Sequence, residues 1–223
     1  MTRRGLADLI NRQKDLEVCA QAGEPHQAMQ AIRLSRPHLV IMDLSLPGKG
    51  GLELIKDIRA EYPRLFILVL SLHEEALYAA RALHAGAHGY IMKVESGECI
   101  LKAIRRVLAG EGYVSGKMSS TILRMFSGRQ SPEYSSPVDR LTDREFEVLQ
   151  LIGQGQGSRE IAQRLCLSSK TVGAHRAKIK KKLCLENSSA LVRYAVRWVE
   201  TEQRQPARRE GLLIPPQADA DLA

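Results

Sequence analysis

The segment from Leu141 to Trp198 constrains the fold of this chain more than any other. Its apolar residues recur at helical spacing, and short stretches that do not fit this spacing separate the predicted helices. LTDREFEVLQLI predicts an amphipathic helix, and the following GQGQG ends it. SREIAQRL predicts a second short helix, CLS a tight turn, and SKTVGAHRAKIKKKL a third helix rich in Lys and Arg. Two helices joined by a short turn, the second of them basic, form the helix-turn-helix arrangement that lays a helix into the major groove of DNA.

The start and the core of this helical segment can also be predicted. Thr142 and Glu145 have the spacing of a capping box, which starts a helix directly after Leu141. A last helix over 189–199 has a stripe of valines, which packs on its own domain or pairs with a second copy of the chain. The apolar stripes of the three preceding helices predict core residues: Val148, Leu149 and Ile152; Ile161, Ala162 and Leu165; Val172, Ile179 and Leu183.

The first 109 residues alternate predicted helices with predicted strands. HLVIMD and LFILVLS are continuous apolar runs, typical of strands buried on both faces of a parallel sheet. The alternation predicts an α/β fold with a doubly wound parallel sheet and right-handed crossovers. We expect helices over 3–12, 25–35, 51–62, 74–85 and 97–109, and strands over 16–20, 38–43, 65–71 and 89–93.

Two segments of different character accompany these domains. Residues 110–136 predict a polar, Pro-bearing linker with one helix over 117–126. The helical DNA-binding domain is expected over 137–202, and residues 203–223, with three prolines and no periodicity, are expected to be disordered.

The placement of charge favours nucleic acid as the partner of the second domain. The net charge is +8, and residues 141–209 hold 14 Lys and Arg against 7 Asp and Glu. The first 140 residues are therefore nearly neutral, and an anionic partner is expected for the C-terminal half, DNA before membrane. No apolar run approaches the roughly 20 residues that span a bilayer, and the polar first residues exclude a signal peptide, so we expect a cytoplasmic protein.

Three polar residues close three of the predicted strands. Asp43 follows LVIM, Ser71 ends FILVLS and Lys93 follows YIM. The carboxyl ends of parallel strands meet at one edge of a sheet, where a carboxylate, a hydroxyl and an ammonium group could take up a phosphoryl group. Asp43 would be the nucleophile, Lys93 the counter-charge and Ser71 a hydrogen-bond donor. The alternative is three unrelated polar residues at strand ends.

The motifs around these residues match a known family. MDLSLPGKGGLE, LVLS and HAGAHGYIMK resemble the receiver domain of two-component response regulators, and the helical segment resembles the LuxR-type helix-turn-helix. In this order, from about Thr2 to Arg197, the chain resembles the NarL/FixJ family of transcriptional regulators. The resemblance implies a flavodoxin-like receiver over 1–109, followed by an all-α, four-helix DNA-binding domain.

The resemblance also implies roles for residues of the receiver. Asp43 would be the phosphoacceptor, Ser71 the switch hydroxyl, Lys93 the phosphoryl-binding lysine and Tyr90 the aromatic switch. A sensor histidine kinase would supply the phosphoryl group, and Mg²⁺ would bind Asp43 and the backbone carbonyl of Ser45.

One departure from the family affects this site. The family's first strand and the acidic pair after it precede the helix that begins here at Arg3, and the sequence has no residues to supply them. The expected Mg²⁺ site is therefore short of anionic ligands. Either the start codon is assigned too far downstream, or the receiver is truncated and does not respond to phosphorylation.

The face of the third helix that would contact DNA carries basic residues and residues with small side chains. Its groove-facing positions in the family correspond to Gly173, Ala174 and Ala177, which can pack against thymine methyl groups but offer no side-chain hydrogen bonds. Backbone contacts and DNA shape would then contribute much of the specificity. The full set of expected DNA-binding residues is Ser158, Lys170, Thr171, Val172, Gly173, Ala174, His175, Arg176, Ala177 and Lys178.

The leading hypothesis is a regulator of transcription that binds double-stranded DNA and is controlled by phosphorylation of Asp43. The alternative keeps DNA binding but makes the truncated receiver an interaction or dimerisation module. We expect a homodimer on DNA, with RNA polymerase as a further candidate partner. An α/β enzyme fused to a DNA-binding domain has no support, because the sequence lacks GxGxxG, a P-loop, a nucleophile elbow and a metal cluster. No enzyme activity is expected.

Overall fold

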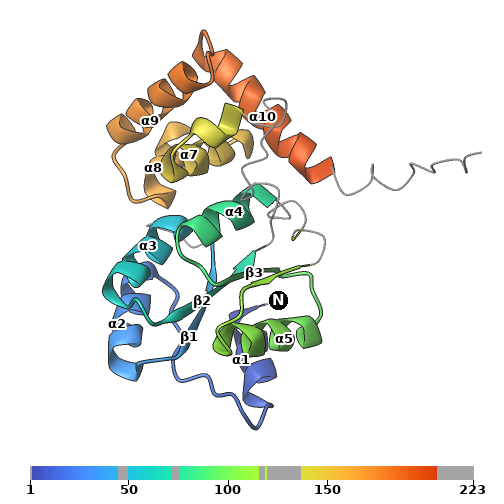
Figure 1. The fold of residues 1–223 in the computed structure, drawn as a ribbon. Coiled ribbons are helices and arrows are strands. Elements are labelled where there is room, and N and C mark those ends of the chain that lie inside the picture. Colours follow the sequence, from blue (N-terminus) through green and yellow to red (C-terminus); the bar gives the residue numbers. More distant parts are fainter. Residues whose placement is uncertain (1, 45–49, 72–75, 116–118, 120–136, 205–223) are drawn as a thin grey trace, which may run out of the picture.

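The computed structural model describes residues 2–44, 50–71, 76–115, 119 and 137–204. Over these residues the chain forms an α/β domain and a helical domain (Figure 1). The predicted linker helix lies outside the described residues apart from residue 119, which is helical. The last helix continues to Arg204, so it is longer than predicted, and the rest of the predicted tail lies outside the described residues.

Most of the predicted elements of the α/β domain are present. The strands are β1 (Leu39–Asp43), β2 (Phe66–Ser71), β3 (Gly89–Met92) and β4 (Tyr113–Val114), the last of which the sequence did not predict. The helices are α1 (Arg3–Asn11), α2 (Pro25–Ser35), α3 (Gly51–Glu61), α4 (Ala76–His84) and α5 (Gly97–Leu108).

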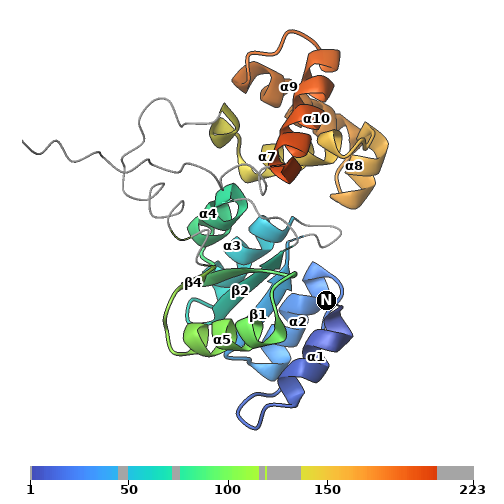
Figure 2. The ribbon, with the colours of Figure 1, turned by 90° about the vertical axis from the view of Figure 1, so that its right-hand side faces the viewer.

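The four strands form one parallel sheet in the order β1-β2-β3-β4. Helices α1 and α5 cover one face, packing on Leu68 and Leu70 of β2, and helices α2, α3 and α4 cover the other, packing on Ile67 and Val69 (Figure 2). Side chains of β2 are therefore buried on both faces, as its continuous apolar sequence predicts.

The strand predicted over 16–20 is absent, and this prediction was wrong. These residues are described and have no strand pairing, and the backbone N–H of Val18 donates instead to the side-chain Oδ1 of Asn11 at 2.8 Å. In the described sheet β1 is an edge strand, and three of its apolar residues, Leu39, Val40 and Ile41, are only partly buried. A strand exists only when a neighbour accepts and donates its backbone hydrogen bonds, and no described strand lies beside 16–20.

The helical domain consists of η2 (Pro137–Arg140), α7 (Asp143–Gly153), α8 (Ser158–Arg164), α9 (Ser169–Lys182) and α10 (Ser188–Arg204). All nine residues of its predicted apolar stripes are buried. Helix α10 packs on α7 so closely that a Cβ on Gly153 would lie 2.5 Å from the carbonyl oxygen of Ala195. Helix α10 packs on its own domain through Leu191 and Ala195, both 0% exposed. The predicted valine stripe is only partly buried, with Val192 39% exposed, and its pairing with a second copy stays a prediction. Among the described residues, no helix is long and apolar enough to cross a membrane.

Candidate functional site

The sheet brings the three predicted strand-end residues to one edge. Asp43 ends β1, Ser71 ends β2, and Lys93 follows β3 directly. The backbone N–H of Lys93 donates to the carbonyl oxygen of Ser71 at 2.7 Å, and the Lys93 ammonium donates to Oδ2 of Asp43. Both charged side chains are largely buried, with 28% of Asp43 and 15% of Lys93 exposed. The carboxylate and its counter-charge are therefore in direct contact.

The two residues assigned to switching lie inside the domain. Ser71 and Tyr90 are both 0% exposed. Tyr90 belongs to the core that packs against α2, α3 and α4, so its ring occupies an inward position. Ser71 therefore lies at the carboxyl end of β2 and Tyr90 inside β3, both within the core, and their switching role stays a prediction.

The described residues around Asp43 do not fit a Mg²⁺ ion. Mg²⁺ binds oxygen ligands in near-octahedral geometry and usually takes more than one protein or phosphate oxygen. No group of three or more His, Cys, Asp or Glu side chains that could hold a metal occurs in the described part of the chain. The carboxylate of Asp43 is already paired with Lys93, and Ser45, the other predicted ligand, lies outside the described residues.

A short turn and a side-chain cap position α9 in the helical domain. Cys166 adopts a left-handed conformation with a φ of 51°, which reverses the chain after α8. Ser168 then caps α9, because its Oγ accepts a hydrogen bond from the backbone N–H of Thr171 at 3.0 Å. The Ser168 and Thr171 hydroxyls also lie 2.7 Å apart, so the Thr171 hydroxyl is held at the cap.

An ion pair with a buried carboxylate connects the C-terminal end of α9 to α7. Lys182 donates to Oε2 of Glu145 at 2.7 Å, and only 3% of the Glu145 side chain is exposed. Glu145 also forms the predicted capping box with Thr142, accepting from its backbone N–H at 2.9 Å. Burial alone would raise the pKa of Glu145, but the hydrogen bonds from Lys182 and Thr142 outweigh it and lower that pKa. Lys182 is therefore part of the scaffold as well as of a basic run.

The solvent-facing side of α9 carries the small and basic residues that the sequence predicts. Lys170, Gly173, Ala174, Ala177 and Lys178 are all exposed, and a Cβ on Gly173 would meet nothing within 4 Å. In Figures 1 and 2, α9 lies on the side of its domain away from the α/β domain. This side of the helix is free to approach another macromolecule.

The remaining predicted DNA-binding residues are not equally placed. Val172 is 0% exposed, so its inclusion was wrong: at its position on α9 the side chain packs into the core. Thr171, Arg176 and Ser158, the first residue of α8, are partly exposed. His175 is partly buried, and burial together with nearby Arg144 lowers its pKa, so its ring is neutral near pH 7.

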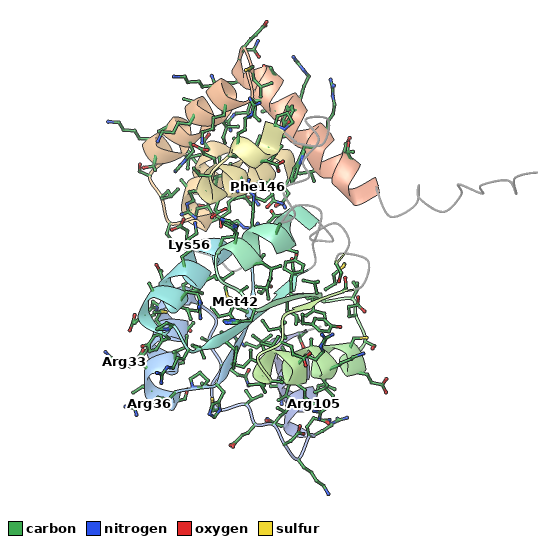
Figure 3. All side chains as sticks on the ribbon, viewed as in Figure 1. Arg33, Arg36, Met42, Lys56, Arg105 and Phe146 are labelled. Atoms are coloured by element: carbon green, nitrogen blue, oxygen red, sulfur yellow. The ribbon has the colours of Figure 1, made fainter. Side chains whose placement is uncertain are left out.

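The contact between the two domains was not predicted from the sequence. Asp143 at the start of α7 accepts from Lys56 of α3 and Arg81 of α4, both in the other domain. Figure 3 shows Lys56 and Phe146 where the two domains meet. No local pattern marks such a contact, because its residues are distant in the chain and are ordinary surface residues of their own helices.

Two family models match this chain. Residues 1–105 match the response regulator receiver domain, and residues 139–195 match the bacterial regulatory proteins of the luxR family. The two matches cover the α/β domain and the helical domain in the order seen in the structure.

Individual proteins and solved structures are similar over most of the chain. The oxygen regulatory protein NreC of Staphylococcus aureus is 37% identical over 201 residues, which cover 88% of this chain and 93% of NreC. RcsB of Salmonella enterica serovar Typhimurium, solved bound to promoter rprA with a phosphomimetic, has a TM-score of 0.61 and 26% identity, covering 86% of this chain and 92% of that one. A LuxR-family response regulator from Aurantimonas sp. has a TM-score of 0.53 and 33% identity, covering 55% of this chain and 88% of that one.

Proposed function

Because this chain belongs to the two-component response regulators that join a receiver domain to a luxR-type DNA-binding domain, we propose that it regulates transcription by binding double-stranded promoter DNA through α9. The observation that carries the proposal is the exposed side of α9. It has basic side chains at Lys170 and Lys178 and residues with small side chains between them. Lys side chains there neutralise phosphates and position the helix, and the small residues allow it to approach the base edges closely.

A charge-removing substitution on α9 tests DNA binding. Lys170→Ala is expected to weaken binding to all DNA sequences by a similar factor and to reduce the slope of log affinity against log salt by about 1. Lys102→Ala is the matched control, since Lys102 is exposed on α5 of the receiver. Fluorescence anisotropy with labelled duplexes over a range of salt concentrations measures both quantities. An unchanged affinity and slope for Lys170→Ala would remove α9 as the DNA-contacting helix.

We propose that phosphorylation of Asp43 by a partner histidine kinase controls this binding. In this step an Asp43 carboxylate oxygen attacks the phosphorus of a phosphohistidine, and the imidazole leaves with its bonding electrons. The ion pair with Lys93 supports this role, because the ammonium group that neutralises the carboxylate would neutralise the phosphoryl oxygens after transfer. Receiver domains use Mg²⁺ in phosphorylation, and binding of that ion at Asp43 and Ser45 remains a prediction, which the described residues do not favour.

The second candidate is a regulator whose receiver does not respond to phosphorylation. The observation that favours it is that the described residues contain no group of three or more His, Cys, Asp or Glu side chains that could hold a metal ion. One experiment separates the two candidates: incubation of the full chain with a small acyl phosphate and Mg²⁺, followed by intact-mass measurement. A gain of one phosphoryl group that is lost in Asp43→Asn supports control at Asp43, whereas an unmodified chain supports the second candidate.

The remaining assignments follow from this function. A homodimer would place two α9 helices on half-sites one helical turn apart, and RNA polymerase would be a partner at the promoter. A protein that binds chromosomal DNA in a bacterium works in the cytoplasm, and the proposed role requires no enzyme activity of its own.

A further inference from the structure

The contact between the domains is held by an ion-pair cluster around Asp143. Lys56 of α3 lies 2.5 Å from Oδ2 of Asp143, and Arg81 of α4 lies 2.9 Å from Oδ1. Only 16% of the Asp143 side chain and 11% of the Arg81 side chain are exposed. Arg81 also donates to the carbonyl oxygens of Val138 and Leu141, each at 3.0 Å, and its guanidinium lies 4.4 Å from the centre of the Phe146 ring. This cluster stabilises docking of the DNA-binding domain on the receiver.

A second carboxylate in the same contact has less favourable surroundings. Glu147 of α7 lies against Gly50, the residue before α3, and a Cβ on Gly50 would lie 1.9 Å from Oε1 of Glu147. Only 13% of the Glu147 side chain is exposed, and its one described ion pair is with Arg144 of its own helix, at 2.9 Å. Docking therefore buries the carboxylate of Glu147, and no described ion pair joins this carboxylate to a residue of the receiver.

The charged groups around Glu147 come from three helices. Arg144 and Asp143 belong to its own helix, Glu53 comes from α3 of the receiver, and Arg164 of α8 lines the same small cavity as Gly50 and Glu147. The N-terminal end of α3 favours a negative charge. Burial is the largest influence and raises the pKa of Glu147; Glu53 and Asp143 raise it further, and Arg144 opposes them without cancelling the effect.

We propose that Glu147 sets the strength of the contact between the two domains: its ionised carboxylate weakens the docking that Asp143, Lys56 and Arg81 stabilise, and neutralising it tightens that docking. We call this contact between the two domains the latch, because its strength depends on the charge of Glu147. In the docked structure burial raises the pKa of Glu147, and Glu53 of the receiver raises it further. Undocking would expose the carboxylate and separate it from Glu53, so docking is favoured by proton uptake, and this gain is lost as pH rises through the raised pKa.

The consequence for DNA binding rests on the function proposed above. The DNA-facing side of α9 is exposed in the docked structure, so docking does not act by covering that side. It fixes the direction of α9 relative to the receiver instead. Two copies that associate must present their α9 helices at a set spacing, so the strength of the latch decides how freely each α9 can reach its half-site.

Small-angle X-ray scattering on the full chain without DNA tests the latch separately from DNA binding. The fraction of docked molecules is measured over a pH series that starts near the ordinary carboxylate range of about 4, and the lowest and highest pH at which the chain stays folded are compared. We expect the natural chain to be more docked at the lower pH. Glu147→Gln is expected to be severalfold more docked at the higher pH and to show little pH dependence. The control Glu98→Gln, an exposed carboxylate on α5, is expected to behave as the natural chain.

Two further variants distinguish an effect on docking from an effect of Glu147→Gln on folding. Gly50→Ala changes the receiver side only, at a φ of −56° that alanine accepts, and its methyl group is expected to displace Glu147 and lower the docked fraction. Arg81→Ala is expected to open the contact at both pH values. The proposal is overturned if Glu147→Gln is docked no more than the natural chain or keeps its pH dependence. It is also overturned if Arg81→Ala leaves the docked fraction unchanged, whatever the DNA affinity of these variants.

Discussion

At the scale of single residues, Glu145 connects the start of α7 with the end of α9. Its carboxylate accepts from the backbone of Thr142 and from the ammonium of Lys182, while the side chain is almost completely buried. A buried carboxylate that lost its cation would remain desolvated and poorly compensated, which is more costly than losing an exposed ion pair. Lys182 therefore contributes to the stability of the DNA-binding domain.

We predict that Lys182→Met destabilises the chain by about 1–2 kcal/mol, since Lys182 is itself about a third exposed. Lys181→Met, an exposed neighbour, is the control and should change stability by less than about 0.5 kcal/mol. Urea unfolding followed by circular dichroism measures both. Because the folded pKa of Glu145 is lowered, its contribution is present above the unfolded pKa and is lost as pH falls through the folded value. The difference between Lys182→Met and the natural chain should therefore shrink in acid, and equal effects of the two substitutions at neutral pH would contradict the assignment.

At the scale of elements, side-chain caps mark the start of two helices of the DNA-binding domain, α7 and α9. Thr142 caps α7 and Ser168 caps α9, each by accepting a hydrogen bond from a backbone N–H three residues later. These N–H groups have no partner inside the helix, so a cap oxygen removes an unsatisfied donor. Caps of this kind lie within one turn of the chain, which is why the sequence predicted the start of α7 correctly.

The cap of α7 provides a prediction at this scale. Thr142→Ala removes the hydroxyl that accepts from the backbone N–H of Glu145 and is expected to lower the free energy of unfolding by about 1 kcal/mol. Thr201→Ala, at an exposed position within α10, is the matched control and should have a much smaller effect. Thermal unfolding of the two variants side by side tests this. A Thr142→Ala variant as stable as the control would show that the remainder of the capping box suffices.

At the scale of the whole molecule, the described contacts between the two domains include the ion pairs of Asp143, the packing of Glu147 against Gly50 and an aromatic contact. The Tyr78 and Phe146 rings lie 4.8 Å apart across the contact, beside the Arg81 cluster. Each domain nevertheless has core residues of its own. In the helical domain Leu149, Ile161 and Val172 are among those that are completely or almost completely buried.

This separation predicts that residues 137–204 fold alone. Domains of about 60 residues can bury enough apolar surface to be stable. The isolated domain should unfold cooperatively, at a lower urea concentration than in the full chain, because Phe146 loses the cover of Tyr78 and Arg81. It should still bind DNA, since the exposed side of α9 with Lys170 and Lys178 belongs to this domain. A non-cooperative transition in circular dichroism would show that the receiver is required for folding.

The short-range features of this protein were readable in the sequence. The period of apolar residues predicted α7, α8 and α9, and the apolar runs predicted β1, β2 and β3. Asp43, Ser71 and Lys93 were predicted to converge because the carboxyl ends of parallel strands share one edge, and the structure brings them together. Each of these inferences depends on a pattern within one element or on a general rule of sheet topology.

The features that escaped prediction all depend on partners distant in the chain. LEVCA has the composition of a strand but no described neighbour with which to pair. Lys182 lies in a run of exposed cations until folding places it beside Glu145, and Arg81 resembles any helical surface arginine until Asp143 docks against it. Helical periods and caps arise from contacts within one or two turns, so the local sequence encodes them. Strand pairing, buried ion pairs and the contact between domains depend on the three-dimensional arrangement. It brings together residues that are distant in the chain, and no local sequence pattern identifies one as the partner of the other.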